Sequence, residues 1–138
     1  MKRLITTAML AALAVAGFMR VARAQDQDPP LEPRVLAYDK GPAKIDVSKY
    51  PAPLQKSYKL FLAKCGHCHT PARAINCDFV LDDEWERYVK RMMRKAGSYI
   101  TPDEGKAIYE FVVYDSKTRK KDLYDKKLKE AGKPGSDR

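Results

Sequence analysis

The sequence has few cysteines and histidines, and it has no long apolar run beyond its first two dozen residues. Three cysteines and two histidines occur among its 138 residues. An odd number of cysteines argues against a scaffold held by disulfides alone, since disulfides use cysteines in pairs. The chain length allows one small domain and excludes two domains with large separate cores.

Basic residues outnumber acidic ones, but the central part of the chain has no net charge. The formal net charge is +9. Residues 25–116 carry fourteen bases and fourteen acids, residues 1–24 carry four bases and no acid, and residues 117–138 carry nine bases and four acids. A nucleic-acid-binding domain places its basic residues on the folded body, so this distribution argues against nucleic acid as a partner.

Residues 1–24 have the pattern of a secretory signal peptide. A positive start is followed by an uncharged apolar stretch over residues 4–18, and Ala22-Arg23-Ala24 fits a cleavage signal. This stretch is shorter than the roughly twenty apolar residues that a membrane span requires. We therefore expect cleavage after Ala24, with an uncleaved anchor as the alternative. The mature chain is expected to be periplasmic or otherwise exported, without a membrane span.

Helical signals dominate the rest of the chain. Six of the nine prolines lie within residues 25–53, which predicts an extended, proline-rich arm over residues 25–52. Apolar side chains at three- and four-residue spacing predict a helix over residues 53–65. No segment alternates apolar and polar residues as a half-buried strand does. The predicted fold class is all-α.

Two further helices are predicted from their capping signals. One begins at Asp82 or Asp83, with Glu86 as the capping partner. The other begins at Thr101, with Glu104 at the third helical position. Together with the helix before them, they define the predicted domain.

That domain covers residues 53–116, and a basic segment, residues 117–138, follows it. A weaker helix is predicted over residues 120–131, and a solvated basic tail is the alternative. Its lysines could steer acidic partners by long-range attraction.

The motif that predicts chemistry is Cys65-Gly66-His67-Cys68-His69. C-x-x-C-H is the attachment pattern of c-type haem, in which two thiols bond to the porphyrin vinyl groups. His69 would then be the fifth iron ligand, and His67 a spacer. A redox-active dithiol is the first alternative, but it would open a helix in a βαβ unit. A zinc site is the second, but it would require two further ligands at paired spacing.

From about residue 50 to residue 114 the chain resembles the small bacterial class I monohaem cytochromes c. Besides the motif, this resemblance rests on Phe61, on Trp85 and on the run from Met93 to Glu104. It implies a cytochrome c-like fold of three to four helices around one covalently attached haem c, with Phe61 packed against residues 108–112. The implied function is one-electron transport to a redox partner protein, and no enzymatic activity is expected.

Three sulfurs are candidates for the sixth iron ligand. Register with the family favours Met93, although Arg94 stands where the family has proline, and Met92 is a weaker alternative. Cys77 is a strong alternative because it is the thiol that haem attachment leaves over. The chain is similar in size and layout to the heterodimeric His/Cys-ligated cytochromes c of anammox bacteria.

The sixth ligand decides between two functions. A methionine raises the reduction potential and suits an electron carrier. A thiolate lowers it and can detach on reduction, which would open the iron to NO or CO. An open iron site is the remaining possibility, and a monomer, a homodimer and a heterodimer are all compatible with the sequence. A peroxidase is not expected, because the only spare histidine, His67, lies inside the attachment motif.

Overall fold

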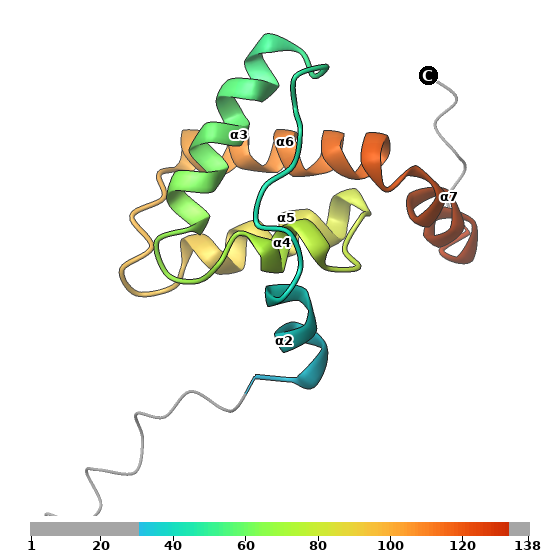
Figure 1. Cartoon of the computed structure of the whole chain (residues 1–138), viewed down its shortest axis with the longest axis horizontal. Coiled ribbons are helices and arrows are strands. Elements are labelled where there is room, and N and C mark those ends of the chain that lie inside the picture. The colour runs from blue at the N-terminus through green and yellow to red at the C-terminus, as the bar shows by residue number, and fades with distance from the viewer. Residues whose placement is uncertain (1–30, 133–138) are drawn as a thin grey trace, which may run out of the picture. The chain divides into compact units, whose positions relative to one another are not determined.

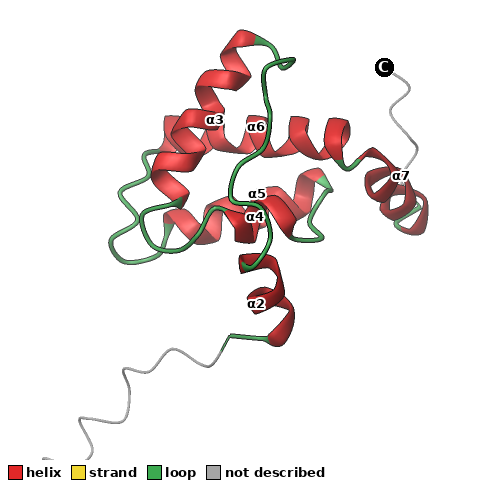
Figure 2. Cartoon of the chain, viewed as in Figure 1, coloured by secondary structure: helices red, strands yellow, loops and turns green. Residues whose placement is uncertain are grey.

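The computed structural model describes residues 31–132, and in this range it contains helices and no strands (Figures 1 and 2). The predicted signal peptide lies outside the described residues. The all-α prediction is confirmed for the described range, in which no helix is both long enough and apolar enough to cross a bilayer. The helices are α2 (Pro33–Asp39), α3 (Ala52–Cys65), α4 (Ala72–Asn76), α5 (Asp82–Met93), α6 (Pro102–Arg119) and α7 (Lys121–Glu130).

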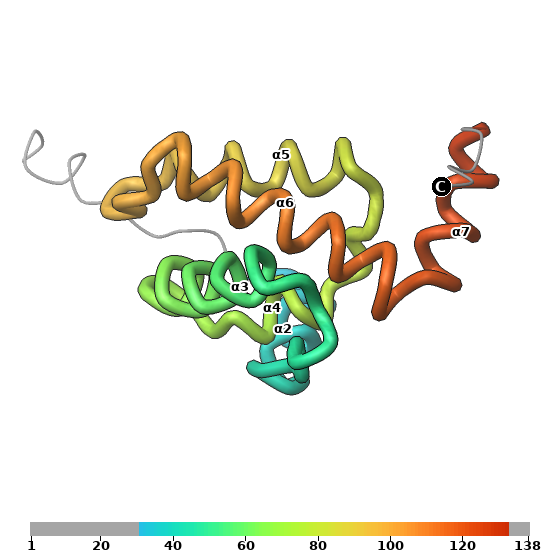
Figure 3. Tube along the Cα trace, turned by 90° about the horizontal axis from the view of Figure 1, so that it is seen from above, coloured from blue at the N-terminus to red at the C-terminus, as the bar shows by residue number. Residues whose placement is uncertain are grey.

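Helix α6 is the central element of the unit that begins at Glu32. It packs against α3 and α5, and its carboxyl end leads into α7 (Figures 1 and 3). Between α3 and α6, the rings of Phe61 and Phe111 lie 5.3 Å apart, and both side chains are almost fully buried. The packing of Phe61 on the last helix of the domain, which the family resemblance implies, is therefore present.

The start of α6 is as predicted, and the start of α5 is not. At α6, the Thr101 hydroxyl accepts from the Glu104 amide, and the Glu104 carboxylate accepts from the Thr101 amide. At α5 the N-cap is Leu81, and the Glu84 carboxylate accepts from the amides of Val80 and Leu81 at 2.9 Å each. The prediction of an aspartate cap is wrong because this carboxylate already satisfies the amides before the helix.

The predicted extended arm contains a helix. Pro33 begins α2 as its first residue, where a proline is well tolerated. The helix is fixed to α4, which the sequence analysis missed, since Arg73 pairs with Asp39 at 2.6 Å. The Asn76 amide also donates to the carbonyl oxygens of Tyr38 and Pro42. A purely extended arm is thus the wrong description of residues 33–39.

Residues 117–132 of the basic segment are a structural part of the fold. Its predicted helix is confirmed as α7, but the proposed boundary before residue 117 falls within α6. Tyr124 and Leu128 pack with Val80 and Leu81 in a second, smaller core. Lys127 also pairs with Glu84 at 2.8 Å. Helix α7 is therefore docked, not a solvated tail.

Candidate functional site

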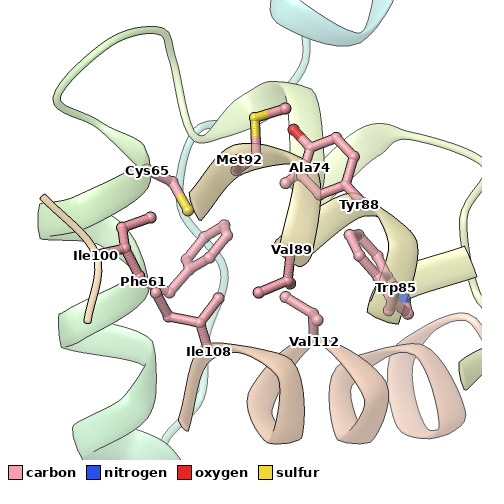
Figure 4. Close-up of a pocket in the computed structure, with 10 residues that line it drawn as sticks. All are labelled: Phe61, Cys65, Ala74, Trp85, Tyr88, Val89, Met92, Ile100, Ile108 and Val112. Carbon is pink, nitrogen blue, oxygen red and sulfur yellow. The ribbon is translucent and has the colours of Figure 1, made fainter. Parts of the chain in front are cut away.

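An apolar pocket lies between α3, α4, α5 and α6 (Figure 4). It contains about 290 Å³ of empty space, part of it open to solvent. The cavity itself has room for only about 10 Å³, roughly one water molecule, so a porphyrin would require the walls of the pocket to part. Among its lining side chains, polar atoms occur only as the thiol of Cys65, the thioether of Met92, the hydroxyl of Tyr88 and the indole nitrogen of Trp85. The lining residues are Phe61, Cys65, Ala74, Trp85, Tyr88, Val89, Met92, Ile100, Ile108 and Val112.

The first cysteine of the motif projects into this pocket. Cys65 is the last residue of α3, and Figure 4 shows its sulfur directed toward Phe61 and Val89. Burial, with a smaller effect of nearby Cys68, raises the pKa of the Cys65 thiol to about 12. Reactive dithiols lower the pKa of their attacking cysteine, so this environment argues against the alternative of a redox dithiol.

The remainder of the motif forms a turn at the end of α3. Gly66 caps the helix, and its amide donates to the Leu62 carbonyl at 3.0 Å. A Cβ at Gly66 would overlap this carbonyl oxygen, so the turn requires glycine. Cys68 is exposed. One thiol of the pair is therefore inside the pocket and the other is on the surface.

His69 is half-buried, and a backbone carbonyl orients its ring. Its Nδ1 lies 3.1 Å from the Thr70 carbonyl oxygen. With the proton on Nδ1, the ring donates to this carbonyl, and Nε2 keeps its lone pair for a metal. His69 does not line the pocket in this structure.

The structure separates the three candidate sulfurs for the sixth ligand. Met92 lines the pocket together with Cys65. Met93 instead packs on α6, where its sulfur occupies the space that a side chain at Gly105 would fill. Cys77 is buried outside the pocket lining, and its thiol donates to the Ala74 carbonyl at 3.2 Å. Met93, the first choice by family register, is thus not the methionine at the pocket.

Tyr88 is a pocket residue that the sequence analysis did not single out as functional. Its hydroxyl is buried and has no hydrogen-bond partner among the described residues. Burial raises the pKa of Tyr88 above its usual range, and electrostatic interaction with Cys65 and Cys77 adds to this rise. Its spacing from Trp85 and Met92 predicts the same helix face. In contrast, nothing in the sequence indicates that the Tyr88 hydroxyl lacks a hydrogen-bond partner.

The donor set fits haem better than an ion held by side chains alone. No three His, Cys, Asp or Glu side chains gather into a possible metal site within residues 31–132. A haem iron takes four ligands from the porphyrin, so the protein must supply only one or two. The buried, unpartnered hydroxyl of Tyr88 is a further feature that a group in the pocket could satisfy.

Comparison with family models, with curated proteins and with solved structures gives no match to this chain. Its function must therefore be argued from its own residues.

Proposed function

We propose that this protein is an exported monohaem c-type cytochrome that carries one electron at a time. The observation that carries the proposal is the position of Cys65, whose sulfur projects into an apolar pocket from the C-x-x-C-H motif. A structural cysteine at the end of a helix would need neither the second thiol nor the adjacent histidine. The spacing of Cys68 and His69 gives each of them a defined role in haem attachment.

Each residue of the site has a separate task in this proposal. Cys65 and Cys68 hold the haem covalently, which prevents its loss outside the cell. His69 binds the iron through Nε2, and the Thr70 carbonyl keeps its ring oriented. The apolar side chains around Cys65 exclude water and lower the local dielectric constant. The haem, when bound, supplies an iron that alternates between the ferric and ferrous states.

Haem attachment is tested by producing the full chain in a host with a c-type maturation system. We expect the purified protein to have the mass of the polypeptide plus one haem, and its absorption to survive acid extraction. The double variant Cys65→Ser with Cys68→Ser removes both covalent bonds to the haem. The Cys77→Ser variant is the control, because it keeps them. A wild-type protein with only the polypeptide mass would contradict the proposal.

Among the methionines, the pocket favours Met92 as the sixth ligand over Met93. The test compares Met92→Leu with Met93→Leu, because leucine conserves the volume and removes the sulfur. We expect Met92→Leu to remove the far-red sulfur-to-iron band of the oxidised protein and to lower its reduction potential. Met93→Leu should leave both unchanged. The opposite result would restore the register that the family resemblance implies.

A low-potential haem protein that binds NO or CO is the second candidate function. It is supported by the burial of Cys77 in the main core cluster, which also contains the pocket residues Trp85 and Val89. If Cys77 is the sixth ligand, Cys77→Ala removes the thiolate absorption and raises the reduction potential. Carbon monoxide should then bind the reduced wild type and the variant alike. An unchanged spectrum in Cys77→Ala would leave this candidate without support.

A further inference from the structure

Residues 94–101, between α5 and α6, display an aromatic side chain in an unusual backbone conformation. Tyr99 has φ of 48°, and its side chain is 77% exposed. A positive φ is uncommon for a bulky residue and is strained. The surrounding structure must therefore hold this residue in place.

Two contacts to the end of α3 hold Tyr99. The Lys64 ammonium donates to the Tyr99 carbonyl at 2.9 Å and also pairs with Glu104 at 2.9 Å. The ring of His67 lies 6.1 Å from the Tyr99 ring in an edge-on arrangement. His67 is the second variable residue of the C-x-x-C-H motif. The backbone of Tyr99 is thus held beside the attachment motif, and its exposed ring has the ring of His67 as a neighbour there.

Three basic residues precede Tyr99 at the end of α5 and in the segment that follows it. Arg91, Arg94 and Lys95 are exposed, and none of them forms an ion pair within residues 31–132. Residues 94–101 contain no acidic side chain. The end of α5 and the segment after it therefore carry exposed basic side chains without an ion-pair partner in the described range, shortly before Tyr99 in the chain.

The tail was expected to steer partners, but much of its charge is used inside the fold. Lys117 pairs with Asp82, and Lys127 pairs with Glu84. Lys120 is largely buried and donates to the Cys77 carbonyl at 2.7 Å. A second group of lysines without ion pairs lies within residues 40–59. No aromatic side chain in that range is exposed.

We propose that Tyr99 and His67, with Arg91, Arg94 and Lys95, form the docking surface for an acidic partner protein. We call this set the Tyr99 surface. Tyrosine is enriched at the energetic centre of interfaces, and cations at the rim accelerate association with an acidic surface. A backbone segment already held in place loses little conformational entropy on binding. The identification of this partner as a redox protein rests on the proposed function, whereas the docking itself does not.

The test uses the full chain and two gold-supported monolayers as probes. One monolayer ends in carboxylates, and the other ends in a mixture of carboxylates and methyl groups. Adsorption is measured by surface plasmon resonance at low and at physiological ionic strength. This readout does not depend on electron transfer.

The charge test compares two double variants with the same change in net charge. Arg94→Gln with Lys95→Gln should weaken adsorption to the carboxylate monolayer about five- to tenfold at low salt. The control is Lys49→Gln with Lys56→Gln, which changes exposed lysines at the opposite end of α3 from Cys65. Equal weakening in both variants would mean that net charge alone drives adsorption, and this would overturn the proposal.

The aromatic test uses the mixed monolayer. Tyr99→Ser should lose the preference of the wild type for this monolayer, about a threefold or larger effect, because a central aromatic contact is removed. Leu36→Ser is the control, since Leu36 is the other large apolar side chain exposed after Glu32 in the described range. Equal losses in both variants would overturn the proposal. If the protein lacks haem but these differences persist, the proposed function fails and the docking surface stands.

Discussion

At the scale of single residues, Asp115 is a buried carboxylate whose partners come from different parts of the fold. The Asp115 carboxylate is 6% exposed. It accepts from the Tyr50 hydroxyl at 2.9 Å and from the Arg119 guanidinium at 3.0 and 2.6 Å. Arg119 in turn donates to the Ile75 carbonyl at 3.0 Å. These bonds join α6 to α4 and to Tyr50, which lies just ahead of α3, so the buried charge also aligns the elements around the pocket.

Loss of the Tyr50 hydroxyl should destabilise the protein. Tyr50→Phe removes one bond to a buried carboxylate, and hydrogen bonds to charged groups contribute about 1.5–3 kcal/mol. Because Arg119 still partners Asp115, we expect the free energy of unfolding in urea to fall by about 1–2 kcal/mol.

The matched control is Tyr114→Phe. The Tyr114 ring packs edge-on against Tyr50 with centroids 5.0 Å apart, but its hydroxyl forms no hydrogen bond with any residue of 31–132. We expect a change below about 0.5 kcal/mol. Equal losses in the two variants would contradict a specific role of the bond between Tyr50 and Asp115.

The sequence could predict which residue types belong to the site, but not all of their surroundings. The motif from Cys65 to His69 is contiguous, so its spacing is visible directly. The choice between Met92 and Met93 is not, because adjacent residues of a helix face different neighbours and only the packing of α6 shows which neighbour each one has. The isolation of the Tyr88 hydroxyl is likewise a property of the folded core.

At the scale of elements, local signals predicted the helices well where the helix carries its own cap or periodicity. Thr101 and Glu104 cap α6 through neighbours three residues apart, so the sequence contains the whole motif. Helices α2 and α4 are short, and each is stabilised by the other through Arg73 and Asp39. Pairings between residues far apart in the sequence leave no local signal, and this is why both helices were missed.

Glu84 joins three elements and should make stability depend on pH. Burial acts to raise the pKa of this carboxyl, but Lys127 and the amides of Val80 and Leu81 outweigh it, and the pKa is lowered. A lowered pKa in the folded state stabilises the protein above the pKa of the unfolded chain, near 4.5. This stabilisation is lost as the pH falls from about 5 through the folded-state pKa.

Glu84→Gln should therefore reduce stability at neutral pH and flatten its pH dependence. The variant loses the ion pair with Lys127 but keeps an oxygen for the two amides. We expect a loss of about 1 kcal/mol at pH 7 and a smaller difference from the wild type at pH 4, measured by urea unfolding. The exposed pair of Glu86 with Lys90 provides the control, since Glu86→Gln should change stability by less than about 0.5 kcal/mol. A pH-independent difference for Glu84→Gln would refute the titration argument.

At the scale of the whole molecule, the three cysteines occupy three different environments. Cys68 is exposed, Cys65 lies in the pocket, and Cys77 is buried in the main core. Burial raises the pKa of both Cys65 and Cys77. Of the three thiols, Cys68 is the exposed one and is therefore the one that a reagent reaches in the folded chain. The odd number of cysteines in the sequence thus corresponds to a pair at one site and a separate buried thiol.

This division predicts the number of titratable thiols in the haem-bearing protein. If Cys65 and Cys68 are consumed as thioethers, as the proposed function requires, the unfolded wild type should react with a thiol reagent at one position, and Cys77→Ala should react at none. In the native state the single thiol should react slowly, because Cys77 is 6% exposed and burial raises its pKa. The polypeptide without haem is the control, and it should titrate three thiols on unfolding, with Cys68 first in the native state. Two or more thiols in the unfolded haem-bearing chain would contradict attachment through both cysteines of the motif, since that attachment leaves only Cys77 free.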